Sequence, residues 1–333
     1  MKVAVIGAGS WGTALAIHLA RAGCDVSLWA REAEVVEGVR RRRRNPLFLP
    51  EFDLPEAVRA TAALGEAAAG AAAVVFVVPV QFARGVLRGL RAHLDPGVPL
   101  VSASKGIEVT SLARMDEVVA AELGLETERF VALSGPSFAR EVAEGRPTAA
   151  VLAGRSGAPL GELQRTFSNG AFRFYTASDV VGVELAGALK NVVAIAAGMA
   201  EGLRLGQNAT AALLTRGLHE IARLGVRLGG KEETFRGLAG MGDLVLTCSP
   251  GSLSRNRSVG ERLGRGERLE DILAGREIAE GVPTTRAAAE LARRHGVVMP
   301  ITSTVEAILD GTLAPREAVT ALMTRSLKEE SIL

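Results

Sequence analysis

Residues 3–22 read VAVIGAGSWGTALAIHLARA, and this stretch decides the fold of the first half of the chain. Val3–Ile6 is a short apolar run, as in a strand that is buried on both faces. The glycines Gly7, Gly9 and Gly12 follow at once, and the residues after them have the apolar spacing of a helix. A strand, a G-x-G-x-x-G loop and a helix in this order form an arrangement that binds the diphosphate of a dinucleotide.

Each glycine of this loop has a separate task. Gly7 permits the tight turn after the strand, Gly9 lets a diphosphate approach the backbone, and Gly12 lets the helix pack closely on the strand. The first turn of the helix offers unpaired N–H groups and the positive end of the helix dipole, and both favour phosphate. We therefore expect the first domain to bind a dinucleotide.

The rest of the first half repeats this alternation of short apolar runs and helical patterns. Further strands are predicted at Val26–Trp29, Ala73–Val78, Leu100–Ser102, Phe130–Ser134, Ala149–Ala153 and Phe172–Tyr175. Helices are predicted at Gly12–Ala22, Glu32–Arg43, Phe82–His93, Leu112–Leu123 and Pro159–Phe167. This rhythm predicts an α/β domain over residues 1–180, with a doubly wound, Rossmann-type parallel sheet and right-handed crossovers.

After about residue 180 the pattern changes to helices alone. The predicted helices are Val181–Leu203, Asn208–Leu224, Arg257–Gly264, Leu269–Leu273, Thr284–His295, Val305–Asp310 and Ala314–Thr324. We therefore expect an all-α substrate-binding domain over residues 181–333, with the junction at Ala177–Val180. The apolar, alanine-rich helices of this half fit a homodimer interface and the core of a monomer equally well.

Composition narrows the classes of function. The chain has 39 Lys and Arg against 37 Asp and Glu, so no broad positive field points to nucleic acid, and aromatic residues make up only 4%. The run Arg40–Arg44 is interpreted as a solvated helix end. Two cysteines and four scattered histidines predict neither a disulfide framework nor a metal site. Without a signal peptide or an uninterrupted apolar span, we expect a cytoplasmic protein that does not insert into a membrane.

The end of the second predicted strand bears on the choice of cofactor. An NAD site usually carries Asp or Glu there to bind the ribose hydroxyls, whereas this strand ends in Leu28-Trp29-Ala30-Arg31. Arg31 can pair with the 2′-phosphate of NADP, although the adjacent Glu32 weakens this inference. We expect NADP(H) to be preferred and NAD(H) to be accepted as well.

Lysine is rare, with 5 of the 39 basic residues, and two lysines have unusual surroundings. Lys105 follows a predicted strand at the edge of the sheet where ligands bind. Lys190 lies in an almost wholly apolar helix, where a cation is costly unless it has a partner or a task. An ammonium can lose its proton when desolvated and a guanidinium cannot, so Lys190 is a candidate proton donor. The alternatives are a lysine that reaches the surface, or one that pairs with Glu184 despite a poor spacing.

Three further motifs offer small residues or groups that bind anions. Residues 134–139, SGPSFA, predict a rigid turn suited to a cofactor or substrate, and Ser137 as a helix N-cap is compatible with that interpretation. Residues 237–243, GLAGMGD, predict a glycine-dense turn that holds a carboxylate. Residues 254–257, SRNR, lie near a helix start and fit a phosphate. Taken alone, the last two motifs are better explained as surface loops.

Together these segments resemble the bacterial NAD(P)-dependent glycerol-3-phosphate dehydrogenase family over nearly the whole chain. The resemblance is carried by GAGSWGTALA from Gly7, SASKGIE from Ser102, LSGPSFA from Leu133, GVELAGALKNVVAIAAG from Gly182, NATAALLTRGLHE from Asn208, GLAGMGDLVLTC from Gly237 and SRNR from Ser254. The dinucleotide motif alone is common to many enzymes, whereas this combination is specific. The chain departs from the family at Val80, where serine is frequent, and in a slightly longer loop before SRNR.

The resemblance implies reversible reduction of dihydroxyacetone phosphate by NAD(P)H to sn-glycerol 3-phosphate, which feeds glycerophospholipid synthesis. It implies that Lys190 is the proton donor and acceptor. The implied substrate contacts are Lys105, Gly135, Ser137, Lys190, Asp243, Ser254, Arg255 and Asn256. The implied dinucleotide contacts are Ser10, Trp11, Arg31, Lys105, Ala139, Arg255, Ile278 and Glu280, in addition to the three glycines of the loop.

Two other functions remain open at this point. One is a 3-hydroxyacid or 6-phosphogluconate type of dehydrogenase with the same architecture, although GMGDL and SRNR speak against it. The other is a non-catalytic dinucleotide sensor that uses the same fold. Such a sensor would need neither a lysine in the apolar helix nor an anion-binding cluster in the second half.

Overall fold

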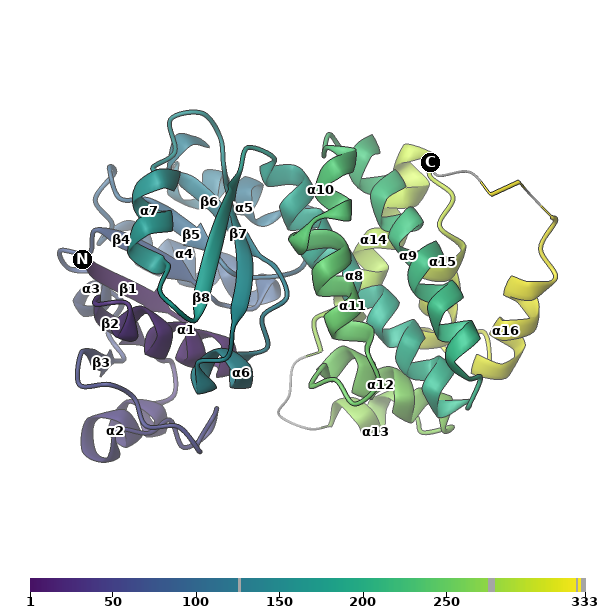
Figure 1. The fold of residues 1–333 in the computed structure, drawn as a ribbon, viewed down its shortest axis with the longest axis horizontal. Helices are drawn as coiled ribbons and strands as arrows, with labels where there is room; N and C mark the ends of the chain where they lie inside the picture. Colours follow the sequence, from purple (N-terminus) through teal and green to yellow (C-terminus); the bar gives the residue numbers. More distant parts are fainter. Residues whose placement is uncertain (125–126, 275–278, 328, 331–333) are drawn as a thin grey trace. The chain divides into compact units, whose positions relative to one another are not determined.

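The structure, a computed structural model of the chain, describes residues 1–124, 127–274, 279–327 and 329–330. The chain divides into two compact units, drawn in Figure 1. Residues 1–104 and 115–180 form the first unit, and residues 105–114 and 181–333 form the second. The segment 105–114, which the sequence assigns to the first domain, therefore belongs with the helices. This segment carries Lys105.

The first unit is built on one eight-stranded sheet with the order β3-β2-β1-β4-β5-β6-β7-β8. The strands are β1 Lys2–Ile6, β2 Asp25–Trp29, β3 Val58–Thr61, β4 Ala73–Phe76, β5 Leu100–Ser102, β6 Phe130–Ser134, β7 Thr148–Gly154 and β8 Phe172–Ala177. The helices are α1 Ser10–Arg21, α2 Ala33–Arg42, α3 Leu64–Ala68, α4 Ala83–Arg91, α5 Met115–Leu123, α6 Ala139–Glu144 and α7 Leu160–Phe167, with 3-10 turns η1 Val80–Phe82 and η2 Thr127–Arg129. The strands from β3 to β6 pair in parallel, and the predicted α/β class is confirmed.

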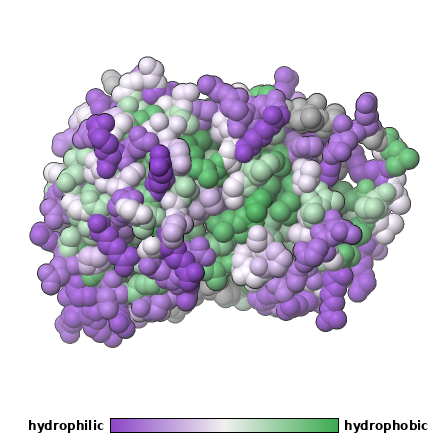
Figure 2. Space-filling model, in the orientation of Figure 1, coloured by the Kyte–Doolittle hydropathy of each residue, from purple (hydrophilic) through white to green (hydrophobic). Residues whose placement is uncertain are grey.

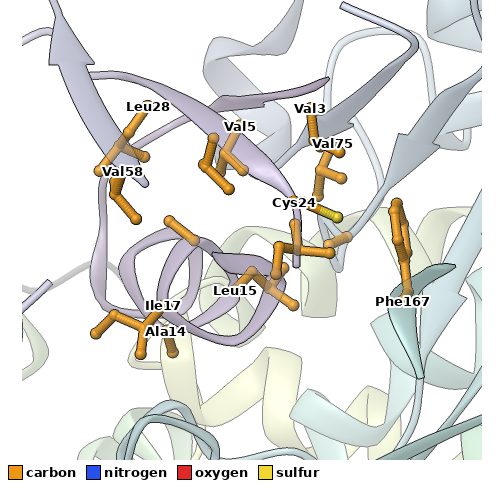
Figure 3. Close-up of a cluster of buried hydrophobic side chains, with 14 of the residues drawn as sticks. Val3, Val5, Ala14, Leu15, Ile17, Cys24, Leu28, Val58, Val75 and Phe167 are labelled. Carbon is orange, nitrogen blue, oxygen red and sulfur yellow. The ribbon is translucent and has the colours of Figure 1, made fainter. Parts of the chain in front are cut away.

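The core of this unit lies between the sheet and its helices. In Figure 3, side chains of β1, β2 and β4 lie over α1, which contributes Ala14, Leu15 and Ile17. Leu15 is 1% exposed and Ile17 is fully buried. Burial of each such side chain contributes about 1.5–3 kcal/mol. This packing fixes the glycine loop at both ends, because β1 leads into the loop and α1 leaves it.

The sheet differs from the prediction in two places. β3 was missed because it is short and places Arg59 on its exposed face, so it lacks a continuous apolar run. β7 was expected to be parallel, but it pairs antiparallel with β6. The chain returns from β6 to β7 through the short helix α6, which packs on α1. A short connection of this kind suits antiparallel neighbours, whereas parallel strands need a longer crossover. A strand buried on both faces has the same apolar pattern in either direction, so the sequence could not reveal this.

The basic run Arg40–Arg44 spans the end of α2, where Figure 2 shows dense hydrophilic side chains at the lower left. α2 ends at Arg42, and Arg43 closes it in the left-handed region with φ of 56°. Arg40 donates to the carbonyl of Ala60, Arg43 donates to the carbonyl of Leu54, and Arg44 pairs with Asp53. These arginines therefore tie the end of α2 to neighbouring backbone.

Within the part of the second unit that the structure describes, all regular elements are helical, as the sequence predicts. Its elements are α8 Val180–Gly202, α9 Gln207–Arg227, α10 Glu232–Arg236, the π-helical turn η3 Leu238–Gly242, α11 Asp243–Cys248, α12 Arg255–Gly264, α13 Leu269–Leu273, α14 Gly281–His295, α15 Pro300–Leu309 and α16 Pro315–Met323. The stretch expected to be a glycine-dense turn is thus part of a helical segment. Gly240 is required there, since a Cβ would lie 2.1 Å from the carbonyl oxygen of Phe235.

α8 is the central helix of this unit. It is long and apolar enough to cross a membrane, but 89% of its most apolar window is buried inside the protein. It also touches α12 backbone to backbone: a Cβ on Gly198 would lie 1.9 Å from the Arg257 carbonyl oxygen, and one on Gly260 would lie 1.9 Å from that of Ile195. The hydropathy of α8 is therefore explained by its place in a protein core.

Candidate active site

Three charged side chains meet in the interior of the helical unit. Lys190 Nζ lies 2.8 Å from Asp243 Oδ1, and Lys105 Nζ lies 2.6 Å from Asp243 Oδ2. Lys190 is 6% exposed and Asp243 is 2% exposed. One carboxylate therefore binds two ammonium groups, and the cluster keeps a net positive charge.

Different elements bring these groups together. Lys190 lies in the middle of α8, Asp243 is the first residue of α11, and Lys105 belongs to the segment 105–114 of the same unit. A carboxylate in the first turn of a helix is stabilised by the helix dipole. The π-helical turn before α11 packs so tightly on α10 that it fixes where α11 begins.

The structure answers the two alternative interpretations of Lys190. Because the side chain is buried, it does not reach the surface. Its partner is Asp243 and not Glu184, which forms an ion pair with Arg114 at 3.5 Å. A lysine held in the interior by a specific carboxylate is typical of a functional site.

Thr247 is a second partner of Lys190 that the sequence did not reveal. Lys190 Nζ donates to Thr247 Oγ1 at 2.6 Å, and Thr247 Oγ1 in turn donates to the Asp243 carbonyl oxygen at 2.6 Å. Asp243 and Thr247 are four residues apart, so one face of α11 presents both. Once the DLVLTC stretch is recognised as helical, this spacing points to the threonine.

The surroundings change the acidity of these groups. Desolvation by burial, reinforced by the charge of Lys105, lowers the pKa of Lys190 to about 8, although Asp243 acts in the opposite direction. Burial alone would raise the pKa of Asp243, but the charges of Lys105 and Lys190 outweigh it and hold the pKa below its usual value. At neutral pH the site therefore holds one carboxylate and a Lys190 ammonium that can lose its proton.

Cys248 lies at the end of α11, close to this cluster. Burial raises the pKa of its thiol to about 12. Because the thiolate is the reactive form, Cys248 is inert at neutral pH and serves as a small core residue.

The SRNR segment forms the start of α12, two residues earlier than expected. Ser254 is the N-cap, and its Oγ accepts a hydrogen bond from the Arg257 N–H at 3.2 Å. Asn256 Oδ1 accepts from the Gly281 N–H at 2.9 Å, and Gly281 packs against the carbonyl of Asn191. The segment expected to bind anions is thereby linked to the α8 residue that follows Lys190.

The glycine loop of the first unit has the geometry that the sequence predicts. Gly7 has φ of 117°, in the region that favours glycine, and a Cβ on Gly12 would lie 1.8 Å from the Gly7 carbonyl oxygen. A Cβ on Gly9 would meet none of the described residues within 4 Å. The loop therefore has room on the Gly9 side and fits the diphosphate of a dinucleotide.

The other predicted contacts in the first unit lie shortly after the carboxyl ends of strands. Arg31, after β2, is exposed and pairs with Glu32 at 2.9 Å. Ser10 and Trp11 begin α1, and Ala139 begins α6. Gly135 has φ of 148° directly after β6.

The interpretation of Ser137 as a helix N-cap is wrong. α6 begins at Ala139 with Phe138 at the N-cap position, and the Ser137 hydroxyl donates to the Gly135 carbonyl at 3.0 Å. The serine therefore stabilises the turn after β6 and not the helix.

One of the two remaining predicted contacts directly precedes α14. Glu280 is at its N-cap position, and Ile278 lies outside the described residues. Within the described part of the chain, no group of three or more His, Cys, Asp or Glu side chains is placed to hold a metal ion.

Comparisons with known proteins give the family. The model for the NAD-dependent glycerol-3-phosphate dehydrogenase N-terminus matches residues 2–158, and the model for the C-terminus of the same family matches residues 179–320. Glycerol-3-phosphate dehydrogenase (NAD(P)+) of Geobacter sulfurreducens is 56% identical over 331 residues, which cover 99% of this chain and 98% of that protein. The protein of the same name from Nitratidesulfovibrio vulgaris is 54% identical over 99% of this chain and 100% of its own length.

A solved structure agrees with these relatives. The crystal structure of glycerol-3-phosphate dehydrogenase from Coxiella burnetii matches with a TM-score of 0.92 and 40% identity, over 97% of this chain and 99% of that one. The resemblance carried by the sequence motifs is thus confirmed along both units. This chain belongs to the NAD-dependent glycerol-3-phosphate dehydrogenase family.

Proposed function

We propose that this chain catalyses the reversible reduction of dihydroxyacetone phosphate by NAD(P)H to sn-glycerol 3-phosphate. The observation that carries the proposal is the buried Lys190 ammonium, held by Asp243 and Thr247 with a lowered pKa. Family membership and the named relatives support the same reaction. The product is a precursor that glycerophospholipid synthesis consumes.

The proton in this reaction comes from Lys190. NAD(P)H held at the glycine loop would supply a hydride to C2 of the ketone, so the oxygen at C2 would gain negative charge. Lys190 donates its proton to this oxygen, while Lys105 adds positive charge nearby. Asp243 orients both ammonium groups and becomes the partner of a neutral Lys190 until solvent returns the proton. In the reverse direction the neutral amine accepts the proton of the alcohol.

Substrate and dinucleotide would be held by the residues that the family resemblance implies. Lys105, Gly135, Ser137, Asp243, Ser254, Arg255 and Asn256 are the proposed substrate contacts. Gly7, Gly9, Ser10, Trp11, Gly12, Arg31, Lys105, Ala139, Arg255, Ile278 and Glu280 are the proposed dinucleotide contacts. We also propose a cytoplasmic location, which the two buried, unpaired cysteines support.

Arg31 is the proposed reader of the 2′-phosphate of NADP(H). Arg31→Ala should lower the ratio of kcat/KM for NADPH to kcat/KM for NADH by about tenfold, because a charge-assisted pair with phosphate is lost. Arg41→Ala is the matched control, since Arg41 is also exposed and also pairs with a glutamate, Glu37. An unchanged ratio in Arg31→Ala would remove Arg31 from this role.

Arg255 is the proposed partner of the substrate phosphate. Arg255→Ala should raise KM for dihydroxyacetone phosphate by about tenfold to a hundredfold and reduce the preference over phosphate-free dihydroxyacetone. Arg262→Ala is the control, because Arg262 lies on the same helix and pairs with Glu267 at the surface. Equal loss of activity with both substrates would show that the phosphate binds elsewhere.

One assay separates the proposed reaction from the alternatives. The purified chain is mixed with NADPH, and the near-ultraviolet absorbance of NADPH is followed after addition of dihydroxyacetone phosphate. Turnover is expected with this substrate, and none is expected when NADP+ is offered with 6-phosphogluconate or a 3-hydroxyacid. NADPH binding without turnover of any substrate would favour the dinucleotide sensor.

A further inference from the structure

Asn45 is a buried polar residue of the first unit that the proposed reaction does not use. It is fully buried and follows the basic run at the end of α2. Its Nδ2 donates to the carbonyl oxygen of Ala8 at 2.9 Å and to Thr13 Oγ1 at 2.8 Å. Ala8 lies inside the glycine loop and Thr13 lies in the first turn of α1. The side chain thus binds the loop and the helix that follows it, from a segment more than thirty residues away in sequence.

The same side chain also fixes its own segment. Asn45 Oδ1 accepts hydrogen bonds from the N–H groups of Leu47 at 3.2 Å and Phe48 at 3.0 Å. This segment is held against α2, because a Cβ on Gly38 would lie 2.6 Å from Pro46 Cδ. Two donors and one acceptor of the amide are therefore used, and a side chain of this length supplies them only as an amide. Aspartate has the same shape but no donor at neutral pH.

The bond to Ala8 orients a peptide group that the dinucleotide needs. In a trans peptide, the carbonyl of Ala8 and the N–H of Gly9 point in opposite directions within one plane. Holding the Ala8 carbonyl on Asn45 therefore turns the Gly9 N–H to the other side of the loop. Gly9 is the position where a Cβ would meet no described residue within 4 Å. An N–H turned away from Asn45 beside this open position is suited to bind a phosphate.

We infer that Asn45 is a positioning residue for dinucleotide binding, which acts by fixing the peptide between Ala8 and Gly9. The inference rests on the proposed function, because it assumes that this loop binds the diphosphate. Asn45 itself does not contact the cofactor in this account. Its loss should weaken the affinity for the dinucleotide and leave the chemistry of Lys190 unchanged.

The test is a titration of the purified full chain with NADPH, followed by the fluorescence of the nucleotide, together with steady-state kinetics. Asn45→Asp keeps the acceptor for Leu47 and Phe48 but places a carboxylate against the Ala8 carbonyl and Thr13. We expect Kd and KM for NADPH to rise by about tenfold or more, corresponding to about 1.4 kcal/mol or more. The kcat at saturating NADPH and the KM for dihydroxyacetone phosphate should stay at the values of the unaltered chain.

Asn169→Ala is the matched control for a purely structural loss. Asn169 Oδ1 accepts from the N–H groups of Ala171 and Phe172 at 2.9 Å, which is the same turn arrangement without a bond to the glycine loop. This variant should lose thermal stability and keep its Kd for NADPH. If Asn45→Asp does not fold, Thr13→Val removes one acceptor of the same amide at almost equal volume. It also removes the bond that the Thr13 hydroxyl donates to the Ala8 carbonyl at 3.3 Å, so it loosens the same peptide and should raise Kd in the same direction.

The outcomes separate the inference from the proposed function. If the unaltered chain does not bind NADPH, the proposed function fails. If it binds NADPH and a folded Asn45→Asp, or Thr13→Val in its place, binds it equally well, the function stands and the role of Asn45 is overturned. A fall in kcat at saturating NADPH with an unchanged Kd would also contradict the positioning role.

Discussion

Lys190→Ala is expected to lower kcat for the reduction of dihydroxyacetone phosphate by about 10²–10⁴-fold, the contribution of a positioned general acid. The Kd for NADPH should stay unchanged, because the dinucleotide is proposed to rest on the glycine loop. The measurement is steady-state turnover at saturating NADPH together with a nucleotide titration. Nearly normal turnover would remove Lys190 from its role.

Two companion variants distinguish charge from proton transfer. Lys190→Arg keeps the positive charge but replaces the ammonium by a group that stays protonated, so it should also lose most of the activity. Lys231→Ala removes an exposed lysine at the start of α10 and should leave turnover unchanged. Full activity in Lys190→Arg would mean that the positive charge is sufficient and that no proton leaves this residue.

Asp243→Asn is expected to have the second largest effect. The carboxylate binds both Lys190 and Lys105, and its loss leaves the buried Lys190 ammonium facing the partly exposed Lys105 ammonium. The pKa of Lys190 should then fall further below about 8, because the repulsion from Lys105 is no longer offset. We expect kcat/KM near neutral pH to fall by about a hundredfold or more, in line with the cost of breaking a buried ion pair. The loss of activity with rising pH should also begin at a lower pH.

Asp116→Asn is the control for this variant. Asp116 is also buried and also paired, with Arg155 at 2.8 Å, but it lies in the first unit. Its loss should reduce thermal stability without moving the pH profile. If Asp243→Asn changes only thermal stability and keeps the pH profile of the unaltered chain, Asp243 does not control the acidity of Lys190.

The sequence predicts the local parts of this structure well, because their causes are local. Neighbouring residues determine the strand before Gly7 and the helix after Gly12. They also determine the long apolar helix that carries Lys190. β3 is not predicted because a short, half-exposed strand has no distinctive periodicity. The direction of β7 is not predicted because a strand buried on both faces has the same apolar pattern in either direction. The segment 237–243 is predicted to be a turn because glycine is a poor helix former, and its close packing on α10 overrides that preference.

The site is predicted as a set of positions but not as a network. The surroundings of Lys105 and Lys190 mark both as unusual, and the glycine-dense motif marks Asp243. Asp243 binds both lysines, but it is 138 residues from Lys105 and 53 residues from Lys190 in the sequence. No local sequence pattern can reveal contacts over such separations. Thr247 is not predicted as a site residue because its helix is not predicted. Asn45 is not predicted because a polar residue before a proline at a helix end indicates only that the helix stops.

The pH dependence of kcat/KM tests the central claim most directly, namely that Lys190 is the acid of the reaction. This parameter reports the groups of the free enzyme. Reduction requires the ammonium, so kcat/KM for dihydroxyacetone phosphate should fall as the pH rises through about 8. Oxidation of sn-glycerol 3-phosphate requires the neutral amine, so its kcat/KM should rise through the same pKa. Profiles that stay flat across this pKa in both directions would contradict the account.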